Sequence, residues 1–415
     1  MARIIFHIDM DCFFVSCERA KNQALKNKPI VIASNLKRAI ISAMSYEVKE
    51  KGFKTGDPFY KVKNKIKDLI IIEPHYQLYS LMSTKIFKYI ENYFSKNIEI
   101  YSIDECYIDV TEEAKKYNSP INLAKEIQKN ILEIFKIPCS IGISFTKFLA
   151  KMSTNKAKPF GIIQTNKEDI KKNFYDLPIK KIFGIGKASV PKLKENGINT
   201  YEDLVKCENN ILLQKIFGKN YFLFKQDLIG ENLNKQHVLP KETKSISNSK
   251  TFMINDSDNK IFLINELKEI VKNICQRAKN LNLESKKIAL AIRHRNKIWT
   301  QKSKTLSKWT NNFDDLWKNI LILFNKMWNE ELIRGLGASL SSLRTMFNNY
   351  HSLNLFEKNN INKVSKIINQ LNFHEGKNSL KTLLQYSKEI GLDEENIKFL
   401  RKNSKSTNKK INLEE

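Results

Sequence analysis

The sequence predicts an α+β chain that is divided into several domains, and three observations support this. The chain has 415 residues, more than one compact core usually accommodates. Strand-like and helix-like runs mix up to residue 166, which is an α+β pattern. Residues 237–250 are polar and basic and contain a proline, so they are expected to form a linker between two folded parts.

The first part of the chain supplies most of the expected strands. Short apolar runs predict strands, and apolar residues at helical spacing predict helices. Strands are expected at residues 3–8, 28–34, 98–103, 106–110 and 139–144, and helices at 76–96, 121–135 and 145–157, with a turn to helix after residue 40.

The second part begins with short helices and no strand over residues 170–235. Residues 251–345 again combine helices, at 261–281 and 312–330, with strands at 286–295 and about 335–345. Residues 346–415 have helical stretches and end in a polar tip rich in Lys and Asn, which is expected to be disordered.

The charge balance indicates a polyanionic partner. Lys and Arg number 71 against 44 acids, a formal charge of +27, which favours nucleic acid first and an anionic membrane second. No run of 18 apolar residues predicts a membrane span, and an acid at position 9 comes too early for a secretory signal. The six cysteines are scattered, so a zinc site is not expected. They are expected to be reduced thiols in the cytoplasm.

An adjacent acid pair lies in the stretch Y-S-I-D-E-C-Y-I-D, residues 101–109. Neighbouring side chains of a strand point to opposite faces, so Asp104 and Glu105 serve one site only if they lie at a turn. Asp9, at the end of the first strand, is then expected beside them. Three clustered carboxylates repel unless a cation neutralises them, and Mg²⁺ prefers such oxygen ligands. Surface acids at strand ends are the alternative.

Four blocks together resemble the Y-family translesion DNA polymerases, most closely the bacterial polymerase IV group. They are HIDMDCFFVSCE, SYEVKEKG, YSIDECYIDVT and SIGISFTKFLAKMSTNKAKPFG, and they occur in this order. The resemblance covers residues 3 to about 356. It implies a right-hand polymerase fold with a ferredoxin-like palm (1–12 and 76–166), small fingers (13–75), a helical thumb (167–236), the linker, an α/β little finger (251–345), and a clamp-binding segment with a tail (346–415).

The resemblance also implies the metal ligands. They are Asp9, Asp104, Glu105 and the backbone carbonyl of Met10, holding two Mg²⁺ ions for which Mn²⁺ can substitute. Asp11 is expected to order the loop rather than to bind metal. Asp109 matches no ligand and is expected to be structural, turned away from the cluster.

The nucleotide pocket is also implied by the resemblance. Phe14 matches the steric gate that excludes the 2′-hydroxyl of ribonucleotides, and Phe13 packs beside it. Tyr46, Lys49 and Lys158 match residues that grip the triphosphate. The family more often has arginine at position 49, and lysine lacks the bidentate fork. It also often has threonine where this chain has Ala43.

Three further segments match parts that grip DNA or a partner. F-G-I-G-K resembles a helix-hairpin-helix at about 179–205, with Gly184, Gly186 and Lys187 at DNA phosphate, although a tight turn between helices is the alternative. Along residues 286–297, Lys286, Lys287, Arg293 and Arg295 either meet phosphates or form a solvated basic edge. Residues 352–356 resemble a sliding-clamp peptide with anchors Leu353, Leu355 and Phe356.

The expected function is therefore template-directed DNA synthesis of the translesion type, by a monomer of low fidelity without proofreading. The expected partners are primer–template DNA, deoxynucleoside triphosphates and a sliding clamp. Two alternatives remain at this stage. A nucleotidyl cyclase also places paired acids over an antiparallel sheet, and a DNA-binding protein with a weakened site would keep the basic segments.

Overall fold

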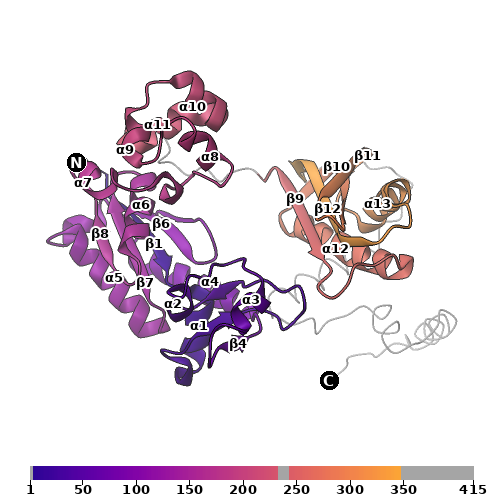
Figure 1. Ribbon diagram of the computed structural model, residues 1–415, viewed down its shortest axis with the longest axis horizontal. Coiled ribbons are helices and arrows are strands. Elements are labelled where there is room, and N and C mark those ends of the chain that lie inside the picture. The colour runs from indigo at the N-terminus through magenta and orange to yellow at the C-terminus, as the bar shows by residue number, and fades with distance from the viewer. Residues whose placement is uncertain (1–2, 232–242, 347–415) are drawn as a thin grey trace, which may run out of the picture. The chain divides into compact units, whose positions relative to one another are not determined.

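The computed structural model of the protein describes residues 3–231 and 243–346. Its helices and strands form three sheets and a helical segment (Figure 1). The clamp-binding segment and the tail after it, which the sequence predicts, lie outside the described residues. Within the described residues, no helix is both long enough and apolar enough to cross a membrane.

A five-stranded sheet in the order β5-β6-β1-β7-β8 is built from strands far apart in the sequence. Its strands are β1 (Ile5–Met10), β5 (Ile98–Ile100), β6 (Glu105–Asp109), β7 (Cys139–Ser144) and β8 (Ile162–Gln164). The central strand β1 runs antiparallel to both β6 and β7, while β8 runs parallel to β7. All residues of β1 are buried, so side chains on both of its faces lie in the interior.

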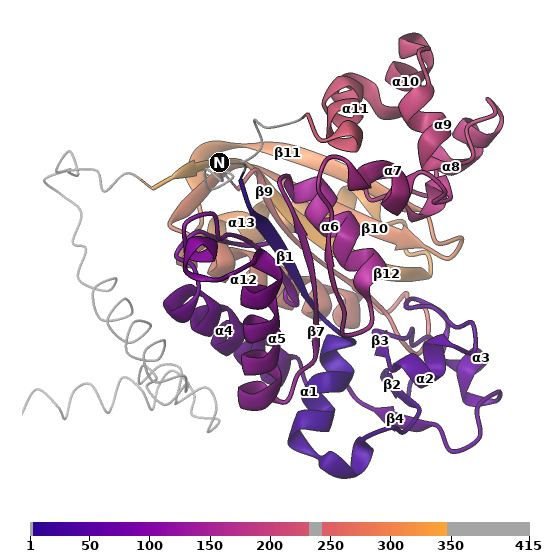
Figure 2. The same ribbon diagram turned by 90° about the vertical axis from the view of Figure 1, so that its left-hand side faces the viewer.

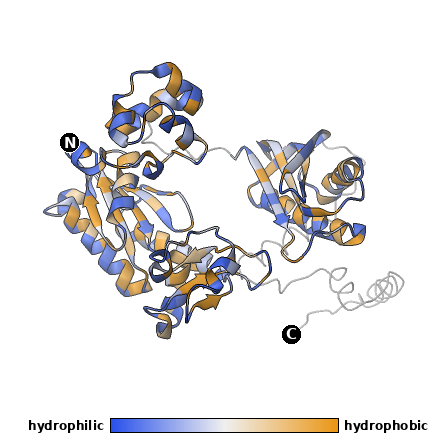
Figure 3. Cartoon of the chain, in the orientation of Figure 1, coloured by the Kyte–Doolittle hydropathy of each residue, from blue (hydrophilic) through white to orange (hydrophobic). Residues whose placement is uncertain are grey.

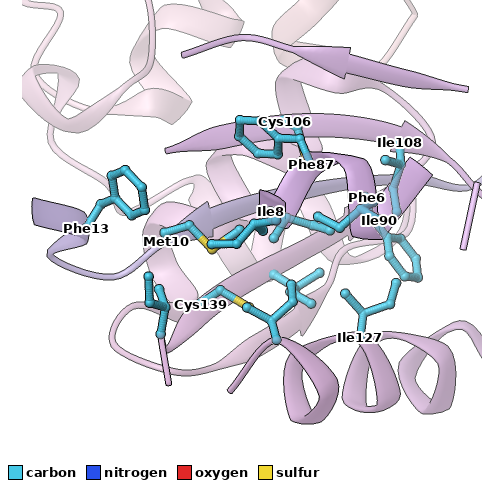
Figure 4. Packing of buried hydrophobic residues seen from close by; sticks show 14 of the residues in the cluster. Phe6, Ile8, Met10, Phe13, Phe87, Ile90, Cys106, Ile108, Ile127 and Cys139 are labelled. Carbon is cyan, nitrogen blue, oxygen red and sulfur yellow. The ribbon is translucent and has the colours of Figure 1, made fainter. Parts of the chain in front are cut away.

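The two faces of this sheet are covered differently. Phe6, Ile8 and Met10 point to the face covered by α4 (Tyr76–Tyr93) and α5 (Pro120–Phe135), where they join one apolar core (Figure 4). The alternate residues of β1 point to the other face, covered by α6 (Lys147–Ala157). Figure 2 shows α4 and α5 on one side of β1 and α6 on the other. Figure 3 shows hydrophobic colours along the strands and mixed colours along α5.

A glycine lets α6 approach the sheet closely. A Cβ on Gly142 of β7 would lie 2.1 Å from the carbonyl oxygen of Ala150 and 2.3 Å from the amide nitrogen of Thr154, so no side chain fits there. Thr146 caps α6 by accepting a hydrogen bond from the Leu149 amide. These two features fix both the start of α6 and its distance from the strands.

The segment after β1 forms a small sheet with its own helices. The strands β2 (Ile30–Ile32), β3 (Ala43–Met44) and β4 (Ile70–Ile72) pair in the order β3-β2-β4. The helices α1 (Phe13–Lys21), α2 (Tyr46–Lys49) and α3 (Phe59–Lys63) and the 3₁₀ turn η1 (Gln23–Leu25) accompany them. A separate apolar cluster, with Val31, Ile41 and Val48 among its members, holds this unit together.

Residues 169–229 are entirely helical or looped. They contain α7 (Asp169–Phe174), η3 (Ile179–Lys181), α8 (Ser189–Lys194), α9 (Tyr201–Lys206), α10 (Asn210–Phe217), η4 (Gly218–Asn220) and α11 (Tyr221–Ile229). Their apolar core includes Phe148, Leu149 and Met152 of α6, so α6 packs against both this segment and the five-stranded sheet. A further 3₁₀ turn, η2 (Glu113–Lys116), follows β6.

A four-stranded antiparallel sheet in the order β11-β10-β12-β9 forms the last described part. Its strands are β9 (Ser245–Thr251), β10 (Leu283–His294), β11 (Trp299–Thr310) and β12 (Ile333–Thr345). The helices α12 (Lys260–Asn280) and α13 (Phe313–Met327) pack on one face through a single apolar core. Asn312 caps α13, and two acids follow in its first turn.

Several sequence predictions need correction. Residues 245–250 were predicted as linker but form most of β9, and β4, β8 and β11 were not predicted. β9 and β11 have mostly exposed polar side chains, so they lack the apolar pattern by which strands are recognised. The predicted strand 98–103 ends at Ile100, and a short strand, β3, precedes the helix expected after residue 40.

Candidate active site

Strand register brings two of the predicted acids together. Asp9 of β1 pairs directly with Glu105 of β6, and residues opposite each other in an antiparallel pair share a face. That face is the one covered by α6. The two carboxylates are therefore neighbours although they are 96 positions apart in the chain (105 − 9).

Asp104 joins them because the chain turns there. β5 ends at Ile100 and β6 begins at Glu105, and the amides of Tyr101 and Ser102 both donate to the Glu105 carbonyl. Asp104 thus lies in the hairpin turn, as the sequence predicted. Glu105 was expected in the turn as well but is the first residue of β6, because it pairs with Asp9. The Met10 amide donates to the Asp104 carbonyl at 2.8 Å, which holds this turn against the end of β1.

Two lysines neutralise the cluster. Lys158 Nζ lies 2.6 Å from Oδ1 of Asp9. Lys151 Nζ lies 3.2 Å from the other oxygen of Asp9 and also forms an ion pair with Glu105. The side chains of Asp9 and Lys151 are largely buried, so these ion pairs are screened weakly by solvent.

A buried histidine completes the group. His7 Nε2 lies 3.4 Å from Oε2 of Glu105, and Nδ1 lies 2.9 Å from the Thr154 hydroxyl. His7, Asp9 and Glu105 each offer one ligand atom, and these atoms lie within 4.8 Å of one another. Two of these ligand atoms are carboxylate oxygens, which suit a hard divalent cation such as Mg²⁺ or Mn²⁺. Asp104, the other predicted carboxylate ligand, is not in this group, and its side chain accepts a hydrogen bond from the Ser102 hydroxyl.

The electrostatic surroundings differ between the two adjacent acids. Burial raises the pKa of Asp104, and the carboxylates of Asp9 and Glu105 raise it further. Burial also acts to raise the pKa of Glu105, but hydrogen bonds with His7 and Lys151 outweigh it and lower this pKa to about 2. Burial is the main cause that lowers the pKa of His7.

Asp11 and Asp109 are engaged in other contacts. Asp11 is 1% exposed and accepts hydrogen bonds from the hydroxyls of Tyr46 and Ser140 and from the Phe160 amide. Asp109 binds the Arg3 guanidinium at 2.6 Å at the far end of β6. The expected separation of Asp109 from the acid cluster is thus observed.

The residues predicted to grip the triphosphate converge on the loop that follows β1. The Tyr46 hydroxyl donates to Oδ1 of Asp11 at 2.9 Å, and Lys49 Nζ lies 3.3 Å from Sγ of Cys12. The ammonium of Lys49 also lies 4.6 Å from the centre of the Tyr46 ring. Lys158 forms an ion pair with Asp9, so the ammonium groups of Lys49 and Lys158 and the Tyr46 hydroxyl surround residues 9–12, beside the acid cluster.

Phe14, the predicted gate, stacks on a held tyrosine. Its ring lies 4.3 Å from that of Tyr79, with 13° between the planes. The Tyr79 hydroxyl donates to buried Glu18 at 2.7 Å, and His75 contacts the same carboxylate oxygen. Phe13 is buried in the core of the five-stranded sheet, with its ring 6.0 Å from that of Phe14.

The predicted helix-hairpin-helix glycines lie in an exposed loop between η3 and α8. Gly184 has a φ of 90°, which glycine adopts without strain. The Gly186 carbonyl accepts hydrogen bonds from the first residues of α8, and Lys187 is exposed beside it. A Cβ on Gly186 would meet no heavy atom within 4 Å, so this side of its backbone faces open space.

The predicted basic residues of β10 are not one uniform cluster. Lys286 donates to the Ser307 carbonyl, and Arg293 donates to Thr251 and lies over the Trp299 ring. Lys287 and Arg293 share one face of β10, because an even number of positions separates them. Arg295 lies beyond the strand end, 3.9 Å from a carboxylate oxygen of Asp256.

The impB/mucB/samB family model matches residues 8–155, and the model of that family's C-terminal domain matches residues 243–355. A DNA polymerase IV from Oceanobacillus iheyensis is 34% identical over 88% of this chain and 87% of the relative. One from Ureaplasma parvum is 34% identical over 86% of this chain and 98% of the relative. The chain belongs to the DNA polymerase IV family.

Solved structures agree with this membership. A Y-family DNA polymerase chimera superposes with a TM-score of 0.70 at 25% identity, covering 82% of this chain and 99% of the chimera. DinB from Sulfolobus solfataricus gives a TM-score of 0.53 at 25% identity, covering 81% and 98%. The right-hand polymerase fold is thus confirmed, and the protein is a metal-dependent DNA polymerase of the translesion type. These matches support neither the cyclase nor the inactive DNA-binding protein.

Sequence reasoning missed several residues of this polymerase site. Lys151 interrupts the apolar run F-L-A-K-M, and a charge at such a position was a usable signal. His7 and Glu18 are polar residues within largely apolar segments and were not considered. Their contacts come from distant parts of the chain, so the pattern alone did not reveal them.

Proposed function

We propose that Asp9, Asp104 and Glu105, with the Met10 carbonyl, hold two Mg²⁺ ions for template-directed DNA synthesis, and that Mn²⁺ can substitute. The observation that carries this proposal is the direct pairing of Asp9 with Glu105 while Asp104 lies in the adjoining turn. When bound, the ions activate the attacking hydroxyl and stabilise charge on the leaving pyrophosphate. The substrates are primer–template DNA and deoxynucleoside triphosphates.

The reaction is a nucleotidyl transfer. The primer 3′-hydroxyl attacks the α-phosphate, the bond from that phosphorus to the bridging oxygen breaks, and pyrophosphate leaves. Tyr46, Lys49 and Lys158 bind the triphosphate, because their polar atoms converge beside the acid cluster. Lys158 would then exchange its contact with Asp9 for a phosphate oxygen.

Phe14 selects deoxyribose. Its ring is held from behind by stacking on Tyr79, so it resists displacement by a 2′-hydroxyl. Phe13 supports the gate from the core. A ring fixed in this way excludes ribonucleotides by steric clash and needs no hydrogen bond to the sugar.

DNA is held mainly through its phosphates. The exposed loop with Gly184, Gly186 and Lys187 offers backbone amides and a cation, and the basic residues of β10, including Lys287 and Arg293, provide further charge. We also propose that residues 352–356 dock on a sliding clamp. The protein acts as a monomer in the cytoplasm, where its DNA and nucleotide substrates are found.

Primer extension tests the metal assignment. Asp104→Ala and Glu105→Ala are each expected to abolish extension by the purified protein with Mg²⁺. Asp109→Ala is the matched control, since Asp109 lies on the same strand as Glu105 but its carboxylate binds Arg3. Extension that persists in both site variants, or its loss in the control alone, contradicts the assignment.

Two other experiments test the gate and the clamp segment. Phe14→Ala is expected to raise ribonucleotide incorporation, and an unchanged preference would show that the gate is elsewhere. Deletion of residues 351–358 is expected to remove stimulation by the clamp and to leave basal synthesis intact. Equal stimulation of the deleted and full-length proteins would rule out docking there.

A further inference from the structure

One buried lysine lies inside the acid cluster. Lys151 is on the face of α6 that packs on β1, and its side chain is 10% exposed. Its ammonium contacts both Asp9, at 3.2 Å, and Glu105. These are two of the three carboxylates to which the proposed function assigns the metal ions.

The position of this ammonium is imposed by the fold. Gly142 brings α6 so close to the sheet that Ala150, which precedes Lys151, and Thr154, about one turn after it, lie against β7. A buried lysine is costly unless acids balance its charge. The Lys151 ammonium contacts one carboxylate on each of two strands, Asp9 on β1 and Glu105 on β6, so two acids balance its charge.

Lys158 differs from Lys151 in its exposure to solvent and in its position on α6. Its side chain is 31% exposed, and it lies at the end of α6, next to the predicted triphosphate position. It can therefore follow an incoming phosphate. Lys151 is enclosed by the helix and the two strands, and its charge stays at the carboxylates.

We propose that the Lys151 ammonium is a built-in counter-ion that competes with divalent metal for Asp9 and Glu105. It stabilises the paired carboxylates before substrate binds and keeps their affinity for metal alone low. Tight metal binding then requires the additional phosphate oxygens of a bound nucleotide. This proposal rests on the metal assignment above and concerns a different property, the affinity for metal in the absence of substrate.

The test measures Mn²⁺ binding to the full-length protein without DNA or nucleotide, with free Mn²⁺ quantified by electron paramagnetic resonance. Lys151→Met removes the charge and keeps most of the side-chain length, and Lys151→Gln is a second, polar replacement. Each is expected to lower the Kd for Mn²⁺ at least about tenfold. The repulsion between one unit charge and a nearby divalent cation exceeds about 1.4 kcal/mol, which corresponds to a tenfold change in Kd. Lys151→Arg keeps the charge and should bind Mn²⁺ as weakly as wild type.

Thermal unfolding provides the second readout. In EDTA, Lys151→Met and Lys151→Gln should melt below wild type, since the carboxylates lose their partner, and saturating Mn²⁺ should raise their Tm more than that of wild type. Lys147→Met is the matched control. It removes a lysine one turn earlier on α6 that pairs with Glu99, which is not a predicted ligand, so Mn²⁺ affinity should not change.

The outcomes separate the two proposals. Unchanged or weaker Mn²⁺ binding in Lys151→Met and Lys151→Gln overturns the counter-ion role. Tighter binding in Lys151→Arg, equal to that in Lys151→Gln, also overturns it, because the charge would then be irrelevant. If Asp9→Asn binds Mn²⁺ as wild type does, the metal assignment itself fails, whatever the lysine variants show.

Discussion

Replacing Asp11 by asparagine removes a carboxylate that connects four segments near the active site. Asp11 is 1% exposed and accepts hydrogen bonds from Tyr46, Ser140 and Phe160 at 2.9 Å each. Asparagine has one oxygen, and its NH₂ group faces a donor, so at least one of the three donors loses its partner. The remaining bonds weaken because the acceptor is neutral.

The expected cost follows from these contacts. A hydrogen bond to a charged group contributes about 1.5–3 kcal/mol, so losing one and weakening the others should lower the free energy of unfolding by roughly 2–4 kcal/mol. For a domain of this kind the Tm should fall by roughly 5–15 °C. Asp11→Asn should nevertheless bind Mn²⁺ far better than Asp9→Asn, since the carboxylate is directed at protein donors.

Thermal and urea unfolding, together with Mn²⁺ titration, check this prediction. Ser140→Ala is the control, because it removes one donor and leaves the carboxylate with Tyr46 and Phe160, so its loss of stability should be smaller. The reasoning is refuted if Asp11→Asn is as stable as wild type and loses Mn²⁺ binding as completely as Asp9→Asn. Asp11 would then be a metal ligand.

Three other predictions concern the surrounding structure. Tyr79→Phe removes the 2.7 Å hydrogen bond to buried Glu18, so urea unfolding should show a loss of about 1.5–3 kcal/mol with the aromatic stack retained. The pKa of Asp109 is lowered: burial opposes this, but hydrogen bonds from neighbouring groups and from Arg3 outweigh it. The stabilisation by the Asp109 carboxylate is therefore present above the ordinary carboxyl pKa and is lost as the pH falls through the lowered pKa. Asp109→Asn should be less stable than wild type at pH 7. In acid unfolding curves, this difference in stability should close below about pH 4. Gly142→Ala would place a methyl group 2.1 Å from a backbone oxygen, so the free energy of unfolding should fall by on the order of 3 kcal/mol or more. Circular dichroism should show a Tm lowered by more than 10 °C or no cooperative unfolding.

The elements that were predicted correctly have strong local patterns. Strand β7 was predicted with its observed bounds, and α5 and α12 were predicted to within one residue at each end, because their apolar residues recur at strand or helix spacing. The strands β9 and β11 were missed because they are polar. Their backbone is held by pairing with β12 and β10, which no local pattern encodes.

The sequence by itself determined that two adjacent acids needed a turn, that Asp9 belonged with them, and that the chain carries a large positive charge. The need for a turn follows from the alternation of side chains along a strand, the grouping with Asp9 from the resemblance to the Y-family polymerases, and the charge from the composition. Only the tertiary structure decided which cations neutralise the acids. Lys151 and Lys158 reach Asp9 because α6 packs across β1, and these two elements are far apart in the chain. The absence of a side chain at Gly142 lets α6 come close enough to the sheet for this contact.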